Sequence, residues 1–91
     1  MRLVWTAGAT RQLDAVGEYV ANDNPRAATK LLKSIRKSAE VLKKNPFIGR
    51  RTEFDNVREL VVYPNYLLSY RVSSVAVEVL QVWHVAQSRY H

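Results

Sequence analysis

The sequence predicts one small α+β domain with the element order β-α-α-β-β-β, a helical hairpin packed on a small, mainly antiparallel sheet. Three observations predict it. Residues 57–72 (VRELVVYPNYLLSYRV) alternate apolar and polar side chains around a Pro64-Asn65 break, which is typical of a half-buried β-hairpin. Two amphipathic helical stripes precede this hairpin, and one apolar strand follows it. A chain of 91 residues fits a single domain that spans residues 1–91.

The N-terminal segment predicts a strand and then a helix. Residues 2–5 (RLVW) are short and apolar, as in a first strand. Thr6 can cap the helix that follows. Gly17 weakens this helix slightly but lets another helix approach closely. The apolar stripe of the helix is formed by Ala9, Leu13, Val16 and Val20.

A second helix starts at Asn24-Pro25, because asparagine is a favoured N-cap and proline suits the first helical position. Pro46 disfavours helical geometry in the residue before it, so the helix should stop near residues 44–45. Very few residues join the two helices, which predicts an antiparallel pair. The apolar stripe of the second helix consists of Ala28, Leu31, Leu32, Ile35, Ala39 and Leu42.

The rest of the chain predicts a loop, the hairpin and a last strand. Residues 45–56 lack any period and form the loop, in which Gly49 should supply a backbone conformation that other residues resist. Residues 75–85 are nearly all apolar, which indicates a strand covered on both faces or flanked on both edges. Residues 86–91 form a polar tail with no room for another helix.

Positive charge is concentrated in one part of the chain. The formal net charge is +6, yet residues 26–51 contain nine basic side chains and one acid, Glu40. This asymmetry suggests a polyanionic partner, either nucleic acid or an acidic protein. The alternative is a solvated helix face that keeps the protein soluble.

Composition excludes several classes of site. The chain has no cysteine, which excludes disulfides and thiolate metal sites and fits a cytoplasmic protein. Two histidines without any cysteine make a zinc site implausible, and the three glycines form no phosphate-binding loop. No apolar run is long enough for a signal peptide or a membrane span, so we expect neither.

Several segments carry a resemblance to a known family. Trp5 is followed by DNPRAA (residues 23–28), NPFIGR (45–50), the hairpin at 57–72 and VWHVAQSR (82–89). In this order they resemble the RelE/ParE superfamily, the toxins of type II toxin–antitoxin modules, some of which stabilise plasmids. The resemblance implies a cognate antitoxin that wraps the toxin, a complex that binds operator DNA through the antitoxin, and no cofactor.

The superfamily contains two kinds of toxin, and the sequence favours one of them. RelE-like members cleave messenger RNA on the ribosome, whereas ParE-like members inhibit DNA gyrase. In RelE-like nucleases an arginine follows the aromatic residue or histidine that opens the strand after the hairpin turn. Here Tyr66 matches the opening residue but Leu67 follows it, and a second basic position of that branch falls near Leu60. The resemblance therefore implies a gyrase inhibitor that needs no catalysis.

Two alternatives remain open. One is a ribosome-dependent mRNA endonuclease, for which the candidate catalytic residues are Arg58, Arg89, Tyr90 and His84. His84 is as well explained as a sheet histidine hydrogen-bonded to a neighbour. The C-terminal Arg89-Tyr90-His91 resembles a triplet of a ribosome-dependent nuclease, although it lies later than an aligned one would. The other alternative is an inactive homologue that only binds an antitoxin.

Candidates for binding the target or the antitoxin are the basic residues Arg36, Lys37, Arg50, Arg51, Arg58 and Arg71. Arg58 and Arg71 could instead form ion pairs with Glu59, Glu78 or Asp55 on the sheet. Arg50 could instead donate to carbonyls of its own loop. Acidic and apolar residues of an antitoxin would suit the basic second helix and the sheet face.

Overall fold

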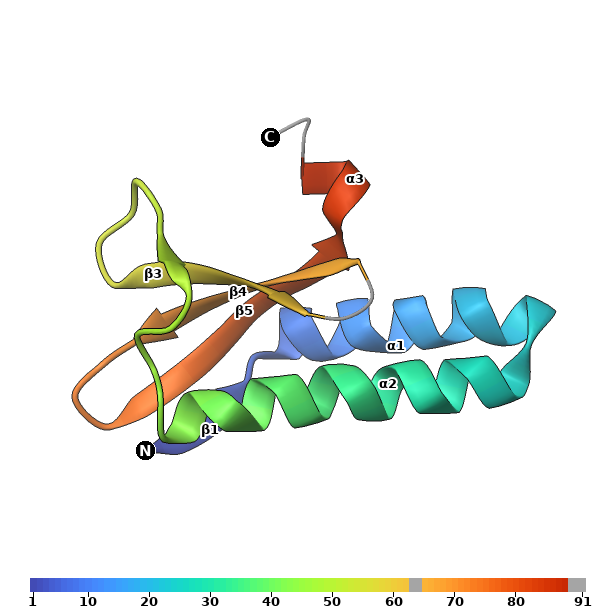
Figure 1. Ribbon diagram of the computed structural model, residues 1–91, viewed down its shortest axis with the longest axis horizontal. Helices are drawn as coiled ribbons and strands as arrows, with labels where there is room; N and C mark the ends of the chain where they lie inside the picture. Colours follow the sequence, from blue (N-terminus) through green and yellow to red (C-terminus); the bar gives the residue numbers. More distant parts are fainter. Residues whose placement is uncertain (63–64, 89–91) are drawn as a thin grey trace.

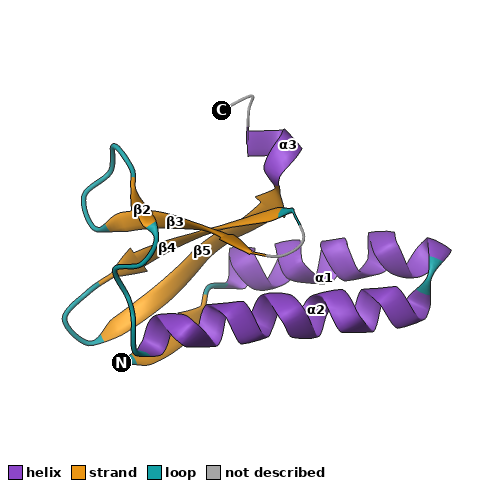
Figure 2. Cartoon of the chain, in the orientation of Figure 1, coloured by secondary structure: helices purple, strands orange, loops and turns teal. Residues whose placement is uncertain are grey.

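A computed structural model gives the fold of the chain and describes residues 1–62 and 65–88 (Figures 1 and 2). Two long helices lie side by side on one face of a sheet, so the α+β class is confirmed. The elements are β1 (Arg2–Trp5), α1 (Ala7–Asp23), α2 (Pro25–Glu40), the 3₁₀ turn η1 (Val41–Lys43), β2 (Arg50–Arg51), β3 (Val57–Val62), β4 (Tyr66–Val72), β5 (Ala76–His84) and α3 (Val85–Ser88).

The predicted caps start both long helices. The hydroxyl of Thr6 accepts a hydrogen bond from the Ala9 amide at 3.2 Å, and Asn24 Oδ1 accepts one from the Ala27 amide at 3.1 Å. Asn24 also ends α1, since its own amide bonds the carbonyl of Val20. The same residue therefore closes one helix and opens the next, and the two helices pair antiparallel as predicted (Figure 1).

The helices pack closely at Gly17. A Cβ atom at this position would lie 2.8 Å from Leu32 Cδ1, closer than real carbon atoms approach. The predicted role of Gly17 in helix packing is thus confirmed. Helix α2 ends at Glu40, a little earlier than expected, and η1 continues the chain as a tighter turn. This turn keeps Leu42 fully buried.

The sheet has five strands in the order β1-β5-β4-β3-β2. Strand β1 runs parallel to β5, and the other pairs are antiparallel. Strand β5 lies between β1 and β4, which confirms that the most apolar strand is flanked on both edges. The core between helices and sheet consists of Ala9, Leu13, Ile35, Ala39, Leu42, Val62, Leu68, Tyr70, Val72, Val77, Val79 and Val82.

Three expectations from the sequence need correction. The loop at 45–56 contains the two-residue strand β2, whose Arg50 and Arg51 pair with Glu59 and Arg58. Only this pairing defines β2, because two residues carry no period. The C-terminal segment begins with the helical turn α3 instead of a polar tail, and the Val85 amide bonds the carbonyl of Asn65 at 2.9 Å.

The third correction concerns Gly49, whose backbone does not have a positive φ. A glycine is needed at this position because no side chain fits: a Cβ atom there would lie 2.5 Å from the Tyr70 hydroxyl and 2.7 Å from the Glu59 carbonyl oxygen. The left-handed conformation in this region belongs to Asn56, with φ 64°. Gly49 is therefore required for close packing of the loop on the sheet.

Candidate functional site

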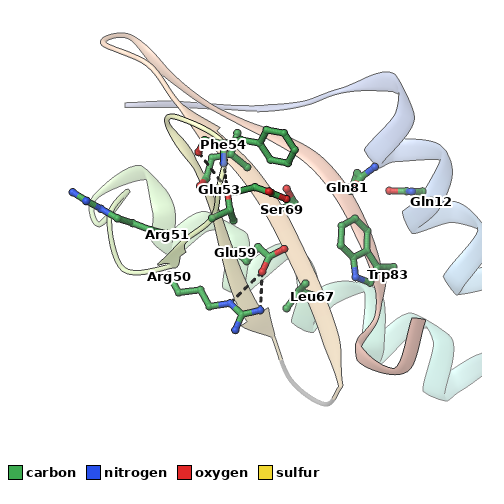
Figure 3. A pocket seen from close by; sticks show the side chains of 12 residues that line it. Gln12, Arg50, Arg51, Glu53, Phe54, Glu59, Leu67, Ser69, Gln81 and Trp83 are labelled. Atoms are coloured by element: carbon green, nitrogen blue, oxygen red, sulfur yellow. Dashed lines mark hydrogen bonds and ion pairs between the residues drawn. The ribbon is translucent and has the colours of Figure 1, made fainter. Parts of the chain in front are cut away.

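A groove of about 750 Å³ opens on the face of the sheet that the long helices leave uncovered (Figure 3). Side chains alternate between the two faces of a strand, so Leu68, Tyr70 and Val72 point to the helices while Leu67 and Ser69 point into the groove. Across the sheet, Leu67 pairs with Trp83, and Ser69 pairs with both Glu59 and Gln81. The register of three strands thus builds one surface, which we call the sheet groove.

The wall of the sheet groove formed by β2 and the loop to β3 carries charge. Arg50 turns toward Glu59, with Nη2 at 2.9 Å and Nε at 3.1 Å from the same carboxylate oxygen (Figure 3). Arg51 points away from that pair. Arg50 was expected to face an anion or to donate to loop carbonyls, and the second of these expectations is wrong. Its partner is Glu59, so the pair presents little net charge.

The carbonyl contacts are made by Arg58 instead. Its Nη1 donates to the carbonyls of Phe47 at 3.1 Å and Gly49 at 2.8 Å, and its guanidinium lies over the Phe47 ring at 5.1 Å from the centroid. Arg58 was proposed as a catalytic or binding residue, or as an ion-pair partner. The structure uses it to hold the loop before β2. The predicted cross-strand pair of Arg71 with Glu78 is confirmed at 3.9 Å, between two partly exposed side chains.

Tyr70 holds the same loop from below. Its hydroxyl accepts a hydrogen bond from the Gly49 amide at 2.9 Å and donates one to the Pro46 carbonyl at 2.8 Å. Burial raises the pKa of Tyr70, and the bond from Gly49 and the charge of Arg58 oppose this rise. Arg58 and Tyr70 together bind three carbonyls and one amide of residues 46–49, and we call them the loop clamp.

The clamped loop and the next loop, between β2 and β3, expose apolar side chains. Phe47 is 63% exposed, Ile48 51% and Phe54 66%. Phe47 and Phe54 line one shallow hollow together with Arg51, and Phe54 also borders the sheet groove. We call Phe47, Ile48 and Phe54 the apolar rim. Three large, exposed apolar side chains on two hydrogen-bonded loops are typical of a binding surface.

The histidine candidate lies elsewhere. His84 pairs with Tyr66 across the strands, their rings meet edge to face at 5.4 Å, and His84 Nδ1 accepts a hydrogen bond from the Ala86 amide. Burial, and to a lesser extent the neighbouring Tyr19, raises the pKa of Tyr66. A hydrogen-bonded sheet histidine, the second of the two interpretations above, agrees with these contacts.

The nuclease candidates among the described residues do not converge. Arg58 pairs with Tyr70 and His84 pairs with Tyr66, and these two positions on β4 are four residues, or roughly 13 Å, apart. Leu67, which stands where the resemblance to RelE-like nucleases would place an arginine, is only 4% exposed at the floor of the groove. Arg89, Tyr90 and His91 lie outside the described residues.

The two helix candidates belong to another surface. Arg36 lies over the ring of Trp5, 5.6 Å from its centroid, and Lys37 is exposed on the same helix. They point away from the sheet groove because α2 turns its apolar side to the sheet. The six basic candidates therefore divide between a loop clamp, two ion pairs, an exposed arginine at the groove and a helix face.

Sequence reasoning missed the apolar rim and Gln12, which lie at or beside the groove. The apolar rim falls in a segment without period, where only the letters FI of NPFIGR and the phenylalanine of residue 54 could have suggested exposed apolar groups. Gln12 was missed as well: its Oε1 accepts a hydrogen bond from the Val82 amide at 2.7 Å, on an edge of β5 beyond its pairing with β1. No local sequence pattern predicts such a contact.

Within residues 1–62 and 65–88, no cluster of three histidine or carboxylate side chains is arranged to hold a metal ion. The same part of the chain contains no helix with the length and apolarity needed to cross a membrane.

Known proteins resemble this chain over nearly its whole length. The sequence profile described as "ParE toxin of type II toxin-antitoxin system, parDE" matches residues 3–89. The protein Y4kP of Sinorhizobium fredii is 37% identical over 94% of this chain and 90% of its own length. Toxin RelE2 of Caulobacter vibrioides is 31% identical over 94% of this chain and 97% of its own.

Solved structures share the fold. A chain of the chromosomal ParDE toxin–antitoxin system of P. aeruginosa superposes with a TM-score of 0.82 at 29% identity, covering 93% of this chain and 96% of that chain. The YoeB/ParE toxin of Agrobacterium tumefaciens superposes with a TM-score of 0.64 at 20% identity, covering 92% and 98%. At that identity the second likeness concerns the fold alone.

Proposed function

The chain belongs to the ParE toxin family of type II toxin–antitoxin systems, and we propose that it inhibits DNA gyrase by direct binding, without catalysing a reaction itself. Membership in a toxin–antitoxin module implies a cognate antitoxin as partner. The proposal therefore concerns two protein ligands, the target and the antitoxin, and the surface that they use.

The observation that carries the proposal is the apolar rim beside the sheet groove. Protein interfaces draw most of their binding energy from large side chains that become desolvated near the centre of the contact, with polar groups around them. Phe47, Ile48 and Phe54 provide such side chains, and Arg50 and Arg51 provide the polar surroundings. The loop clamp holds the backbone at Phe47, and the Thr52 hydroxyl holds the backbone of Phe54, before any partner arrives, which lowers the entropy lost on binding.

The same geometry argues against chemistry at this surface. RNA cleavage requires a base for the 2′-hydroxyl, a proton donor for the leaving oxygen and cations around the phosphate. Leu67 provides none of these, Arg50 is neutralised by Glu59, and Arg58 is occupied by loop carbonyls. A binding function needs only the exposed rim.

We assign the antitoxin to the same surface. A wrapping segment with apolar and acidic side chains would cover the rim and pair with Arg51, and it would thereby mask the surface that binds gyrase. Operator DNA would then be bound by the complex through the antitoxin. In this arrangement a toxin that has bound its antitoxin cannot bind gyrase.

The first experiment is induction of the toxin without its antitoxin, with DNA, RNA and protein synthesis followed separately. We expect DNA synthesis to stop first. Purified toxin should also inhibit supercoiling by purified gyrase and leave cleaved DNA complexes. An early stop of translation, with messages cut at codon boundaries, would overturn the proposal in favour of the nuclease alternative, and a harmless protein would indicate the inactive homologue.

Phe54→Ala tests the surface, and Val75→Ala is its matched control. Phe54 is 66% exposed at the rim, whereas Val75 is 67% exposed in the turn between β4 and β5. Loss of an anchor at a protein interface costs about 2 kcal/mol, or roughly a 30-fold weaker inhibition of gyrase. Val75→Ala should leave inhibition unchanged. Equal effects of the two substitutions would exclude the rim as the binding surface.

The RelE-like nuclease is the second candidate function. Its support is the similarity to Toxin RelE2 and the exposed Arg51, which could contact a phosphate without being part of a catalytic group. Ribosome-dependent cleavage of messenger RNA by the purified toxin would establish it.

A further inference from the structure

The outer face of α2 carries a straight line of positive charge. Arg26, Lys30, Lys33 and Lys37 follow each other at i, i+4, i+7 and i+11, so the 3.6-residue period places them on one side of the helix. All four are exposed. The buried residues Ala28, Ile35 and Ala39 occupy the opposite side. We call these four cations the basic stripe.

The basic stripe is not neutralised by the protein. The ion pairs in the described part of the chain join Glu40 to Lys43, Arg50 to Glu59 and Arg71 to Glu78, and no member of the stripe takes part. Like charges at i, i+3 and i+4 destabilise a helix. A solvated helix face usually mixes both signs, so repulsion along a whole face indicates an external anion.

The surroundings of the stripe indicate which anion. No large apolar side chain of α2 is exposed, whereas an interface with an acidic protein would need such anchors. Single-stranded nucleic acid is bound by aromatic stacking platforms, and α2 contains no aromatic residue. A row of cations on a rigid helix suits the regular phosphates of a duplex, which carry about one charge per 1.7 Å of axis.

We propose that the basic stripe binds the phosphate backbone of duplex DNA without reading its sequence. Eleven residues of helix give the stripe a length of roughly 16 Å. A shallow hollow between Pro25, Arg26, Thr29, Lys30 and Lys33 lies along it. Backbone contacts of this kind supply affinity that depends on salt and not on base sequence.

The stripe and the sheet groove lie on opposite sides of the molecule. Helix α2 lies beside α1 and over one face of the sheet (Figure 1). Its apolar side packs on both, so the stripe points away from them, and the groove opens on the other face of the sheet. One toxin can therefore hold a protein at the groove and DNA at the stripe at the same time. The DNA-binding proposal does not depend on the identity of that protein.

The test measures binding of purified toxin to a fluorescent 20-base-pair DNA duplex by anisotropy, between 50 and 200 mM salt. Four phosphate contacts predict a slope of log K against log salt near −3.6, which is about a 100-fold loss of affinity over this range. The variant Lys30→Gln/Lys33→Gln should reduce the slope by about 2. Glutamine has nearly the helix propensity of lysine, so the variant should remain folded.

Arg2→Gln/Arg11→Gln is the matched control, because it removes the same charge from exposed residues on β1 and α1. Its slope should stay near that of the parent protein. An equal loss in both variants would mean a response to net charge alone and would overturn the proposal, as would the absence of duplex binding. Tighter binding to single-stranded or duplex RNA, or loss of antitoxin affinity in the stripe variant alone, would assign the stripe to another partner.

Discussion

The surroundings of the apolar rim and the helix that carries the basic stripe both contain basic and apolar side chains, but these are arranged in opposite ways. At the rim, Arg50 and Arg58 are occupied by a carboxylate and by carbonyls, while large apolar side chains stand in water. On the stripe, the apolar side chains of α2 are turned inward, and the cations stand in water without protein partners among the described residues. The number of positive charges in a segment is therefore a poor guide to its role.

This difference has a physical basis in the backbone. A loop leaves carbonyls that no helix or strand satisfies, and these carbonyls attract cations. A helix satisfies its interior carbonyls by itself, so cations on its outer face have no internal partner. Arginine thus stabilises structure in the loop before β2, whereas the cations of the stripe are available for binding.

The largest effect is expected at Gly49, whose substitution should disrupt the rim and leave the stripe intact. In Gly49→Ala the new methyl group collides with the Tyr70 hydroxyl and with the backbone at Glu59. The collision and the loss of the Tyr70 hydrogen bonds should lower the free energy of unfolding by about 3 kcal/mol. Urea denaturation of both proteins measures it. Gly8→Ala is the control, since a Cβ atom there would meet only the end of Arg11, and a similar loss in both would refute the packing argument.

A smaller effect follows from removal of the hydroxyl of Tyr70. Tyr70→Phe leaves the buried Gly49 amide and the Pro46 carbonyl without their partner, at a cost of about 2 kcal/mol in the free energy of unfolding. Tyr19→Phe, at a side chain that is 77% exposed, should cost less than about 0.5 kcal/mol. Equal stabilities of the two variants would show that Tyr70 does not hold the loop.

The raised pKa of Tyr70 predicts that the stability of the protein depends on pH. The folded state raises the pKa of Tyr70, so the neutral phenol is favoured by folding. This contribution is fully present below the unfolded pKa near 10 and is lost as the pH rises through the folded value. The stability difference between the parent protein and Tyr70→Phe should hence be constant from about pH 7 to 9 and shrink above about pH 10. A difference that grows with pH would contradict the assigned direction.

The sequence predicted the elements with local signals well and the site only in part. Caps at Thr6 and Asn24 and the hairpin strands follow from neighbours in the chain, and the small size of Gly17 indicated the close contact with α2. The parallel pairing of β1 with β5 and the strand β2 depend on residues far apart in sequence. Arg58 was predicted to act at a site or to form an ion pair, but its partners in the structure are carbonyls, which leave no trace in a sequence of side chains.

The smallest effect separates charge from packing on the stripe. Lys33→Glu places a carboxylate three residues after Lys30, three before Arg36 and four before Lys37, which replaces three repulsions by three attractions. We expect the free energy of unfolding to rise by about 0.5 kcal/mol while affinity for duplex DNA falls, because the stripe then loses a phosphate contact and gains a like charge.

Lys43→Glu is the control for that variant, since it breaks the pair with Glu40 at 2.9 Å and puts two carboxylates side by side. Its stability should fall by about 0.5 kcal/mol, although the change in net charge is the same. Thermal denaturation at low salt measures both changes, and their difference should shrink in 1 M salt. A rise in stability for Lys33→Glu together with a fall for Lys43→Glu would show that repulsion within the basic stripe destabilises α2. A fall in stability for Lys33→Glu would mean instead that Lys33 contributes to packing. The stripe would then, like the loop clamp, use its cations to stabilise the fold.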